Sequence, residues 1–463
     1  MNKRPLNGAD AGADAAALRS APGSSAVSGS LTVSAPGKVI LFGEHAVVYG
    51  KRAVAASVGL RTTAVSRADA SAVRLVLPDV CLDHSWPLER IRECIAGLVQ
   101  GASGVEAAAA AAVSGATNAP TASAPESSRP DQAAAKPTKK RRGASGTTVP
   151  RRSSRASKPT TPGVDSAPAL PHAPASLPAG LVDQLSSLLP DGCSGPAKQS
   201  VLAFFTLYAL ICRGRFGIEV QMESKLPVGA GLGSSASFSV CASATLLLHS
   251  GLVQLGDAGA GQTASFSNSQ LEVINAWAFL SEKVIHGNPS GIDNSLCTYG
   301  GARSYTKTDG MRELKGQAFK AFDFVLTDTN VAKNTKAEVE KVRVRREAHP
   351  HIMDPLLNAV QAIADGCIAG CEKHVNGKLS HAELQTQMGI LIDMNHAILE
   401  AFGVSHPMLE KIRELSAKHG FKSKLTDSDG SRTAAFQASL AAAGCRSFRA
   451  QVGCAGVDAI IGE

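Results

Sequence analysis

The sequence predicts an α+β fold in two parts, divided near residue 320. At 463 residues the chain is long enough for two or three domains, each with its own buried core. Only 4% of the residues are aromatic whereas 44% are hydrophobic, so Ala, Val, Leu and Ile must build these cores. This composition suits layers of helices packed on strands.

The first predicted strand is LTVSA (31–35), which alternates apolar and polar residues and is rich in β-branched side chains. Residues 1–30 before it are rich in Ala, Ser and Gly, and we interpret them as a flexible leader. The leader lacks the apolar stretch of a signal peptide. No stretch of the sequence approaches the roughly 18 consecutive apolar residues of a membrane span. We therefore expect a cytoplasmic protein without a membrane segment.

Residues 103–180 differ in composition from the rest of the chain, being mostly Ala, Ser, Pro, Thr and basic residues. Such a segment buries too little apolar surface to offset its ordering entropy, which predicts a disordered insertion within one folded domain. Nine positive residues lie between Lys136 and Lys158, and removing them from the net charge of +8 leaves −1. Nucleic acid is therefore an unlikely partner of the folded part. Binding of nucleic acid or a protein partner by the basic insertion remains an alternative.

Further elements follow the insertion in a mixed order. An apolar run predicts a helix over 200–212, and alternation over 216–224 predicts a strand with one buried face. The residues of that face are Phe216, Ile218, Val220 and Met222. The remaining predicted elements are helices at 235–250, 271–286, 384–399, 406–420 and 434–444, a strand at 322–328 and a last strand at 453–460.

A glycine-rich loop, KLPVGAGLGSSAS (225–237), separates a predicted strand from a predicted helix. Glycine lacks the Cβ atom that would keep a phosphate away from the backbone, and a helix N-terminus attracts anions. Ser234 and Ser235 add hydroxyls at this point, where one oxygen can reach a divalent metal. The loop therefore predicts a nucleotide site, although a simple glycine turn capped by serine explains these residues equally well.

Two further segments place charged residues beside turns. In SAPGKVILFGEHAVVYGKRAVAASV (34–58), Lys38 follows a Pro-Gly turn and Glu44 and His45 follow a glycine. An ammonium group here can contact phosphate oxygens or favour the charged form of a nearby carboxylate, but a solvated strand edge is the alternative. In SEKVIHGNPSGIDNSLCTYGGA (281–302), Glu282 lies near a helix end and Asp293 begins a new element. A carboxylate held by a rigid turn suits a general base, whereas a surface ion pair and an N-cap are the alternatives.

The ten cysteines form neither a CxxC pair nor a dense framework, which indicates reduced thiols. Cys367, Cys371 and His374 have helical spacing and are the nearest approach to a metal cluster. A structural zinc site usually has four ligands, so we do not predict zinc there.

Taken together, APGKVILFGEHAVVYG, LPVGAGLGSSAS and HGNPSGIDN resemble the mevalonate kinases of the GHMP kinase superfamily. The resemblance covers residues 31–102 and 180–426. Galactokinases and homoserine kinases share the glycine loop but differ around the first block, where EHAVVYGK is similar to mevalonate kinases. The resemblance to mevalonate kinases implies an S5-like N-terminal domain over 31–320, interrupted at 103–180, and a ferredoxin-like C-terminal domain over 321–463.

The same resemblance implies ATP and Mg²⁺ as cofactors, mevalonate as substrate and a homodimer. It assigns Asp293 as the base and Lys38 as its neighbour, which also contacts ATP. Ser235 and Glu282 would hold Mg²⁺. The other implied ATP contacts are Ser224, Gly229, Ala230, Gly231, Leu232, Gly233, Ser234 and Ser235. The implied mevalonate contacts are Glu44, His45, Asp293 and Thr335.

The sequence departs from the family pattern after SKLT (423–426), where the family has a glycine run close to GAGGGGC and then a strand. Here DSDGSRTAAF follows, so the C-terminal domain is expected to be internally truncated after residue 426. A lost strand leaves backbone groups unpaired, and Asp427 and Asp429 bring negative charge near the phosphates. A folded but weakened or inactive relative is therefore the main alternative to an active kinase.

Overall fold

In the computed structural model, one compact unit comprises Met1–Val99 and Leu170–Glu463, and every described residue belongs to it. The described residues are 27, 29–96, 172–227, 229–256, 261–314, 319, 323–329, 335–422 and 430–462. Most of the predicted leader and insertion, and the altered segment at 423–429, lie outside these ranges. The expectations about disorder and about the lost glycine run therefore stay predictions.

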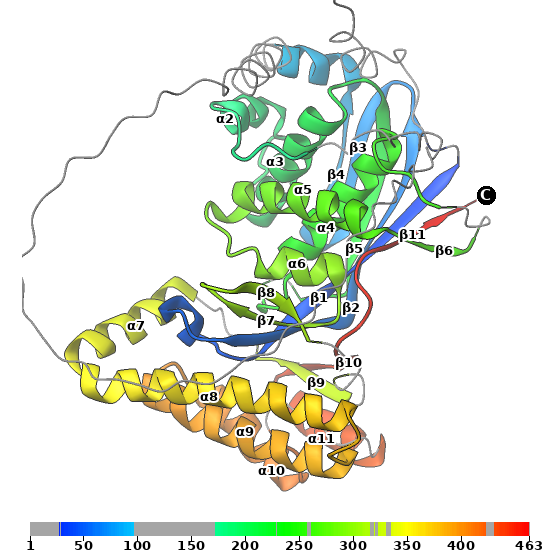
Figure 1. Ribbon diagram of the computed structural model, residues 1–463. Helices are drawn as coiled ribbons and strands as arrows, with labels where there is room; N and C mark the ends of the chain where they lie inside the picture. The colour runs from blue at the N-terminus through cyan, green and yellow to red at the C-terminus, as the bar shows by residue number, and fades with distance from the viewer. Residues whose placement is uncertain are drawn as a thin grey trace, which may run out of the picture. The chain divides into compact units, whose positions relative to one another are not determined.

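A nine-stranded sheet forms the framework of the N-terminal part (Figure 1). Its main path runs β4-β3-β5-β2-β1-β11-β6, and β7 pairs with both β2 and β8. The β3–β5 pair is parallel and the other pairs are antiparallel. The strands are β1 (Ser30–Phe42), β2 (Ala53–Asp69), β3 (Ala72–Leu77), β4 (Leu82–Pro87), β5 (Gly217–Ser224), β6 (Thr263–Ser265), β7 (Ala302–Thr306), β8 (Gly310–Glu313) and β11 (Asp458–Ile461).

Helices pack against this sheet and enclose the largest apolar core. The predicted helices at 200–212, 235–250 and 271–286 are confirmed as α3 (Gly195–Ile211), α4 (Ser234–His249) and α5 (Asn268–His286). The four side chains of the predicted β5 face are all buried in that core, which confirms the period-two pattern. Shorter elements are η1 (Ala46–Tyr49), η2 (Pro78–Val80), α2 (Leu181–Leu185), η3 (Ser186–Leu188) and α6 (Ile292–Tyr299).

The first strand is longer than the sequence predicts. The expected strand ends at Ala35 and a Pro-Gly turn should follow, but β1 continues to Phe42. The pairing of β1 with β2 shifts register between Pro36 and Gly37, so these residues form an irregularity inside the strand. Proline cannot donate to the ladder and glycine tolerates a bulge, which explains why the two residues resemble a turn in the sequence. The expected turn before Lys38 was wrong.

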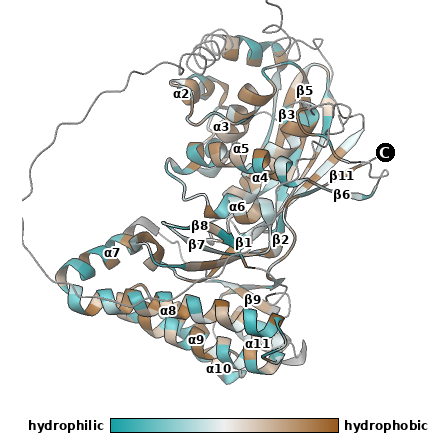
Figure 2. Ribbon diagram, viewed as in Figure 1, coloured by the Kyte–Doolittle hydropathy of each residue, from teal (hydrophilic) through white to brown (hydrophobic). Residues whose placement is uncertain are grey.

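The C-terminal part contains a two-stranded sheet and five helices among the described residues. These elements are β9 (Asp323–Asp328), β10 (Arg446–Gln451), α7 (Thr335–Ala348), α8 (Pro350–Val375), α9 (His381–Phe402), α10 (Pro407–Lys418) and α11 (Gly430–Ala442). The predicted strand at 322–328 and the helices at 384–399, 406–420 and 434–444 are thereby confirmed, with different ends. Brown and teal residues alternate along α8 and α9 in Figure 2, as expected of amphipathic helices.

The last strand, β11, returns from the C-terminal part to the large sheet. It pairs with β1 and β6, although the predicted boundary near residue 320 assigns it to the C-terminal domain. Few residues between 315 and 322 are described, so the exact boundary stays a prediction. The return also brings residues 452–457 against β2 and the end of α6, through bridges at Val58–Val452 and Gly300–Ala455.

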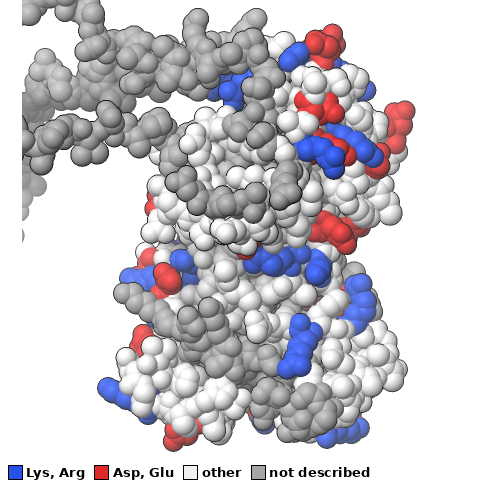
Figure 3. Space-filling model, turned by 90° about the vertical axis from the view of Figure 1, so that its right-hand side faces the viewer, with Lys and Arg blue, Asp and Glu red and all other residues white. Residues whose placement is uncertain are grey.

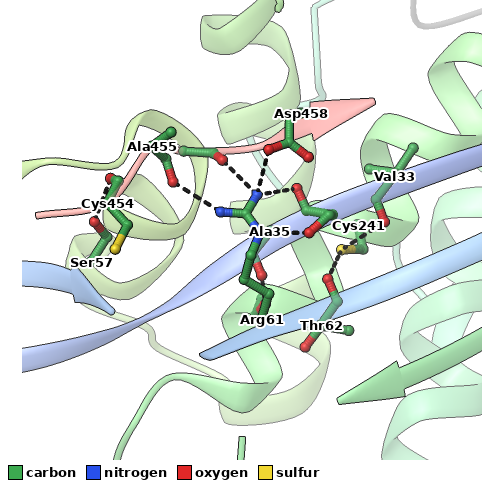
Figure 4. Close-up of polar contacts among 12 residues, drawn as sticks. Val33, Ala35, Ser57, Arg61, Thr62, Cys241, Cys454, Ala455 and Asp458 are labelled. Carbon is green, nitrogen blue, oxygen red and sulfur yellow. Dashed lines mark hydrogen bonds and ion pairs between the residues drawn. The ribbon is translucent and has the colours of Figure 1, made fainter. Parts of the chain in front are cut away.

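Arg61 on β2 forms hydrogen bonds and an ion pair with this returning segment (Figure 4). Its guanidinium donates to the carbonyls of Ala455 at 3.1 Å and Gly456 at 2.9 Å. It also pairs with Asp458 Oδ2 at 3.0 Å and donates to the carbonyl of Ser34 on β1 at 2.9 Å. Burial raises the pKa of Asp458, and the positive charge of Arg61 opposes that rise. One side chain therefore connects three segments that are distant in the sequence.

We expect Arg61→Met to lower the free energy of unfolding by about 2 kcal/mol, because several charge-assisted hydrogen bonds disappear together. Urea unfolding followed by circular dichroism measures the change. Arg67→Met on the same strand is the control, because the Arg67 side chain is 69% exposed and its Nε lies 3.5 Å from Glu219. The control should change stability by less than about 0.5 kcal/mol. Equal changes in the free energy of unfolding for the two substitutions would show that the contacts of Arg61 contribute no more than an exposed ion pair.

Charges of both signs occur on the face shown in Figure 3, and much of that face is uncharged. In the described ranges, no helix combines the length and the apolar character that crossing a bilayer requires.

Candidate active site

The glycine-rich loop connects β5 to the N-terminus of α4, as the sequence predicts. Gly229, Gly231 and Gly233 have positive φ values of 78°, 76° and 76°. Residues with a Cβ atom adopt this backbone conformation only at an energetic cost. Gly233 is also crowded, because a Cβ there would lie 2.8 Å from Lys38 Cγ. It occupies the N-cap position and no side chain caps the helix, so the serine-capped turn was wrong. The first backbone N–H groups of α4 thus remain suited to an anion.

Lys38 lies beside this loop and reaches Asp293. Its backbone N–H donates to the carbonyl of Leu232 at 2.8 Å, which fixes β1 against the loop. Its side chain is 8% exposed, and its Nζ lies 3.2 Å from Asp293 Oδ2. The alternative of a solvated strand edge was therefore wrong for Lys38.

Asp293 stands in the first turn of α6, which follows the turn-forming GNPSG segment. The N-cap of α6 is Gly291, so the N-cap alternative for Asp293 was wrong. Asp293 is 37% exposed, which leaves room for a second contact besides Lys38. A carboxylate held this way can accept a proton from a bound hydroxyl, and the ammonium group of Lys38 fixes its orientation.

Glu282 forms a second acidic position near the first. It lies on α5, its side chain is 4% exposed, and the surface ion-pair alternative was therefore wrong. Ser235 Oγ donates to Glu282 Oε2 at 3.4 Å, and Ser239 Oγ donates to Glu282 Oε1 at 3.2 Å. Burial, and next the negative charge of Asp293, raise the pKa of Glu282 to about 7, although both serines and Lys38 oppose the rise.

The oxygen atoms of Ser235 and Glu282 fit a magnesium ion. Mg²⁺ prefers hard oxygen ligands and usually binds one or two carboxylates together with waters and phosphate oxygens. A nearby cation would offset the desolvation that raises the pKa of Glu282. These two residues are therefore the ones that would hold the ion.

We expect Glu282→Gln to stabilise the metal-free protein at high pH but not at low pH. A carboxyl whose pKa rises from 4.5 to about 7 on folding costs stability as the pH increases from 4.5 to 7, because the buried group must ionise. Glutamine removes this cost. The gain over the original protein should be roughly 2–3 kcal/mol at pH 8 and near zero at pH 4.5. Urea unfolding in EDTA at several pH values measures it, and a gain independent of pH would count against an ionising Glu282.

Three residues near Glu282 were missed by the sequence analysis. Ser239 and Ser281 hydrogen-bond to each other at 2.9 Å behind the carboxylate. His286 Nε2 lies 2.9 Å from Ser235 Oγ and 3.8 Å from Glu282 Oε2. The four-residue spacing from Glu282 to His286 on one helix was the signal available in the sequence.

Two other predicted site residues, Ser224 and Glu44, have described contacts with other segments of the chain. Ser224 ends β5, and its described contacts are with neighbouring segments: its N–H donates to Asp79 Oδ2 at 2.7 Å and its Oγ lies 2.9 Å from Thr62 Oγ1. Glu44 follows β1, and Asn395 Nδ2 on α9 donates to Glu44 Oε2 at 3.5 Å. Sequence analysis gave no signal for Asn395.

His45 and Thr335 each stand at the start of a helical element. His45 precedes η1 with a φ of 61°, an uncommon backbone conformation outside glycine. Thr335 begins α7, but its side chain and the preceding residues 330–334 lie outside the description.

Metal-ligand side chains also occur away from the active site. His374 Nδ1 lies 2.9 Å from the carbonyl oxygen of Leu379. Within the described ranges, His396, Glu400 and Glu410 bring their ligand atoms together instead. Arg413 Nη1 lies 3.8 Å from Glu400 and 3.7 Å from Glu410, so a protein cation already compensates this acidic pair.

Comparison with known proteins identifies the family. Residues 199–301, which include the glycine loop, Glu282 and Asp293, match the family described as GHMP kinases N terminal domain. Human mevalonate kinase is 32% identical over 86% of this chain and 84% of its own length. The chain belongs to the mevalonate kinase family.

Other members of the family agree with this assignment. Mevalonate kinase ERG12 of Gibberella zeae is 33% identical and covers 86% of this chain and 68% of its own length. Among solved structures, a mevalonate kinase superposes with a TM-score of 0.55 at 17% identity, covering 91% of this chain and 98% of the other. The mevalonate kinase of L. major in complex with R-mevalonate gives 0.53 at 17% identity, covering 91% and 96%. These superpositions establish the GHMP kinase fold expected from the sequence.

Proposed function

We propose that this protein transfers the γ-phosphate of ATP to the primary hydroxyl of mevalonate, as a step in isoprenoid and sterol synthesis. The observation that carries the proposal is the Lys38–Asp293 pair, 3.2 Å apart, beside the helix N-terminus that follows the glycine loop. The family relationship supports mevalonate as the substrate, because the human and fungal relatives carry that name.

In this proposal the backbone N–H groups of residues 229–235 bind the phosphates of ATP, and Ser224 contacts the nucleotide. Asp293 accepts the proton of the attacking hydroxyl. Lys38 orients Asp293 through their ion pair and offsets negative charge on the transferring phosphoryl group, so the protein contributes mainly positioning and electrostatics.

Magnesium, held by Ser235 and Glu282, would supply further charge neutralisation at the phosphates. Glu44, His45 and Thr335 would line the mevalonate pocket. We further propose a cytoplasmic homodimer without membrane or nucleic-acid partners, and light scattering after gel filtration tests the dimer.

Release of ADP by the purified protein with Mg-ATP tests the function. We expect turnover with mevalonate and only background with galactose or homoserine. Turnover with galactose alone would assign another GHMP kinase activity. No turnover from a folded protein that binds ATP would favour the inactive relative, in which the altered segment after residue 426 has removed activity.

A further inference from the structure

We propose that His286 positions Ser235 for metal binding by accepting a hydrogen bond from the Ser235 hydroxyl. The inference rests on the proposed function, in which Ser235 and Glu282 hold the divalent ion of the nucleotide. His286 is the last residue of α5, one turn beyond Glu282, and neither the motifs nor the family match assigns it a role.

Two neighbours of Ser235 can accept its single hydroxyl proton, and the imidazole of His286 does so when Nε2 carries no proton. His286 Nε2 lies 2.9 Å from Ser235 Oγ, whereas Glu282 Oε2 lies 3.4 Å away. The shorter contact is within the usual range for a hydrogen bond, and the longer one is near its limit. A proton directed at His286 leaves a lone pair of Ser235 Oγ facing Glu282.

A cation between Ser235 and Glu282 makes this orientation necessary. A proton directed from Ser235 toward Glu282 would point at the positive ion and would be repelled by it. The hydroxyl can coordinate through its lone pair only if another acceptor takes the proton, and within the described ranges the imidazole of His286 is in position. This imidazole must then carry its own proton on Nδ1, and the side chain is 52% exposed, so water can accept from it.

His286 is a positioning residue in this scheme rather than a metal ligand. Magnesium favours oxygen over imidazole nitrogen. The imidazole also lies 3.8 Å from Glu282 Oε2, which places it beside the oxygen pair that would hold the ion. The other oxygen of the Glu282 carboxylate is oriented by Ser239, whose hydroxyl donates to Oε1.

Two substitutions separate the acceptor role from simple packing. His286→Gln places an amide oxygen near the position of Nε2 and preserves an acceptor, whereas His286→Leu removes it. His351→Leu, at an exposed histidine on α8, is the matched control. Calorimetry on the full chain gives the affinity for ATP with Mn²⁺ and the affinity for ATP in EDTA. The first affinity divided by the second reports the contribution of the metal contact.

We expect His286→Leu to lower this ratio about tenfold, as loss of a hydrogen bond to a metal ligand commonly does, with affinity in EDTA unchanged. His286→Gln and the control should stay within about threefold of the original protein. The inference fails if folded His286→Leu keeps the original ratio, or if glutamine is as damaging as leucine. Strong coupling of Mn²⁺ to a directly bound imidazole nitrogen in pulsed paramagnetic resonance would also overturn it. If the original protein itself shows no preference for Mn²⁺-ATP, the proposed function fails instead.

Discussion

Replacement of Asp293 by asparagine should lower kcat for mevalonate phosphorylation at least 10²-fold, because an amide cannot take the proton of the attacking hydroxyl. Asparagine keeps the shape of the side chain and can still accept a hydrogen bond from Lys38, which lies 3.2 Å from the carboxylate. The KM for ATP should therefore change by less than about threefold. Steady-state ADP release at varied ATP and mevalonate measures both constants.

Asp309→Asn is the control for Asp293→Asn. Asp309 is also partly exposed and also pairs with basic residues, since its carboxylate lies 3.6 Å from Arg52 and 3.7 Å from Arg312. It should keep near-normal kcat. Nearly full turnover by a folded Asp293→Asn protein would remove Asp293 from the role of base.

Replacement of Lys38 by methionine should lower kcat by about 10²–10³-fold, because a preorganised positive charge is lost from the transition state. Methionine has a similar length, so it can keep the close contact of the Lys38 side chain with Gly233. Arginine should not restore activity, because its guanidinium is wider and the side chain is held closely. Steady-state kinetics with melting temperatures separates a catalytic loss from unfolding.

Lys51→Met is the matched control for Lys38→Met. The Lys51 ammonium group is exposed and donates to Asn358 Oδ1 at 2.6 Å. Its loss should change kcat by less than about twofold, because a solvated charge contributes little to the transition state. Similar losses in both variants would indicate that general charge, rather than the position of Lys38, matters.

Local sequence patterns predicted the elements that carry the site. The strand β5, the glycine loop and α4 follow from period-two alternation, glycine spacing and an apolar helical run, all of which are local. The pairing of Lys38 with Asp293 did not follow from spacing, because 255 positions separate them and β1 must first pack against α6. The resemblance to mevalonate kinases supplied that contact.

Other features depended on tertiary packing that no local pattern shows. Pro36 and Gly37 resemble a turn, yet the pairing of β1 with β2 carries them through as a strand irregularity. β11 returns to the large sheet by pairing with β1 and β6, and Arg61 bonds to residues of this segment that lie almost 400 positions away. Burial of Glu282, and hence its raised pKa, arises because α5 packs against α4.

The most direct test of the account is transfer of labelled phosphate from [γ-³²P]ATP to mevalonate, with the protein in excess over ATP so that a single turnover suffices. The account predicts a labelled phosphomonoester of mevalonate from the original protein, and at least 10²-fold slower formation from Asp293→Asn. No labelled product from a folded protein that binds ATP would contradict it, and would make this chain an inactive member of its family.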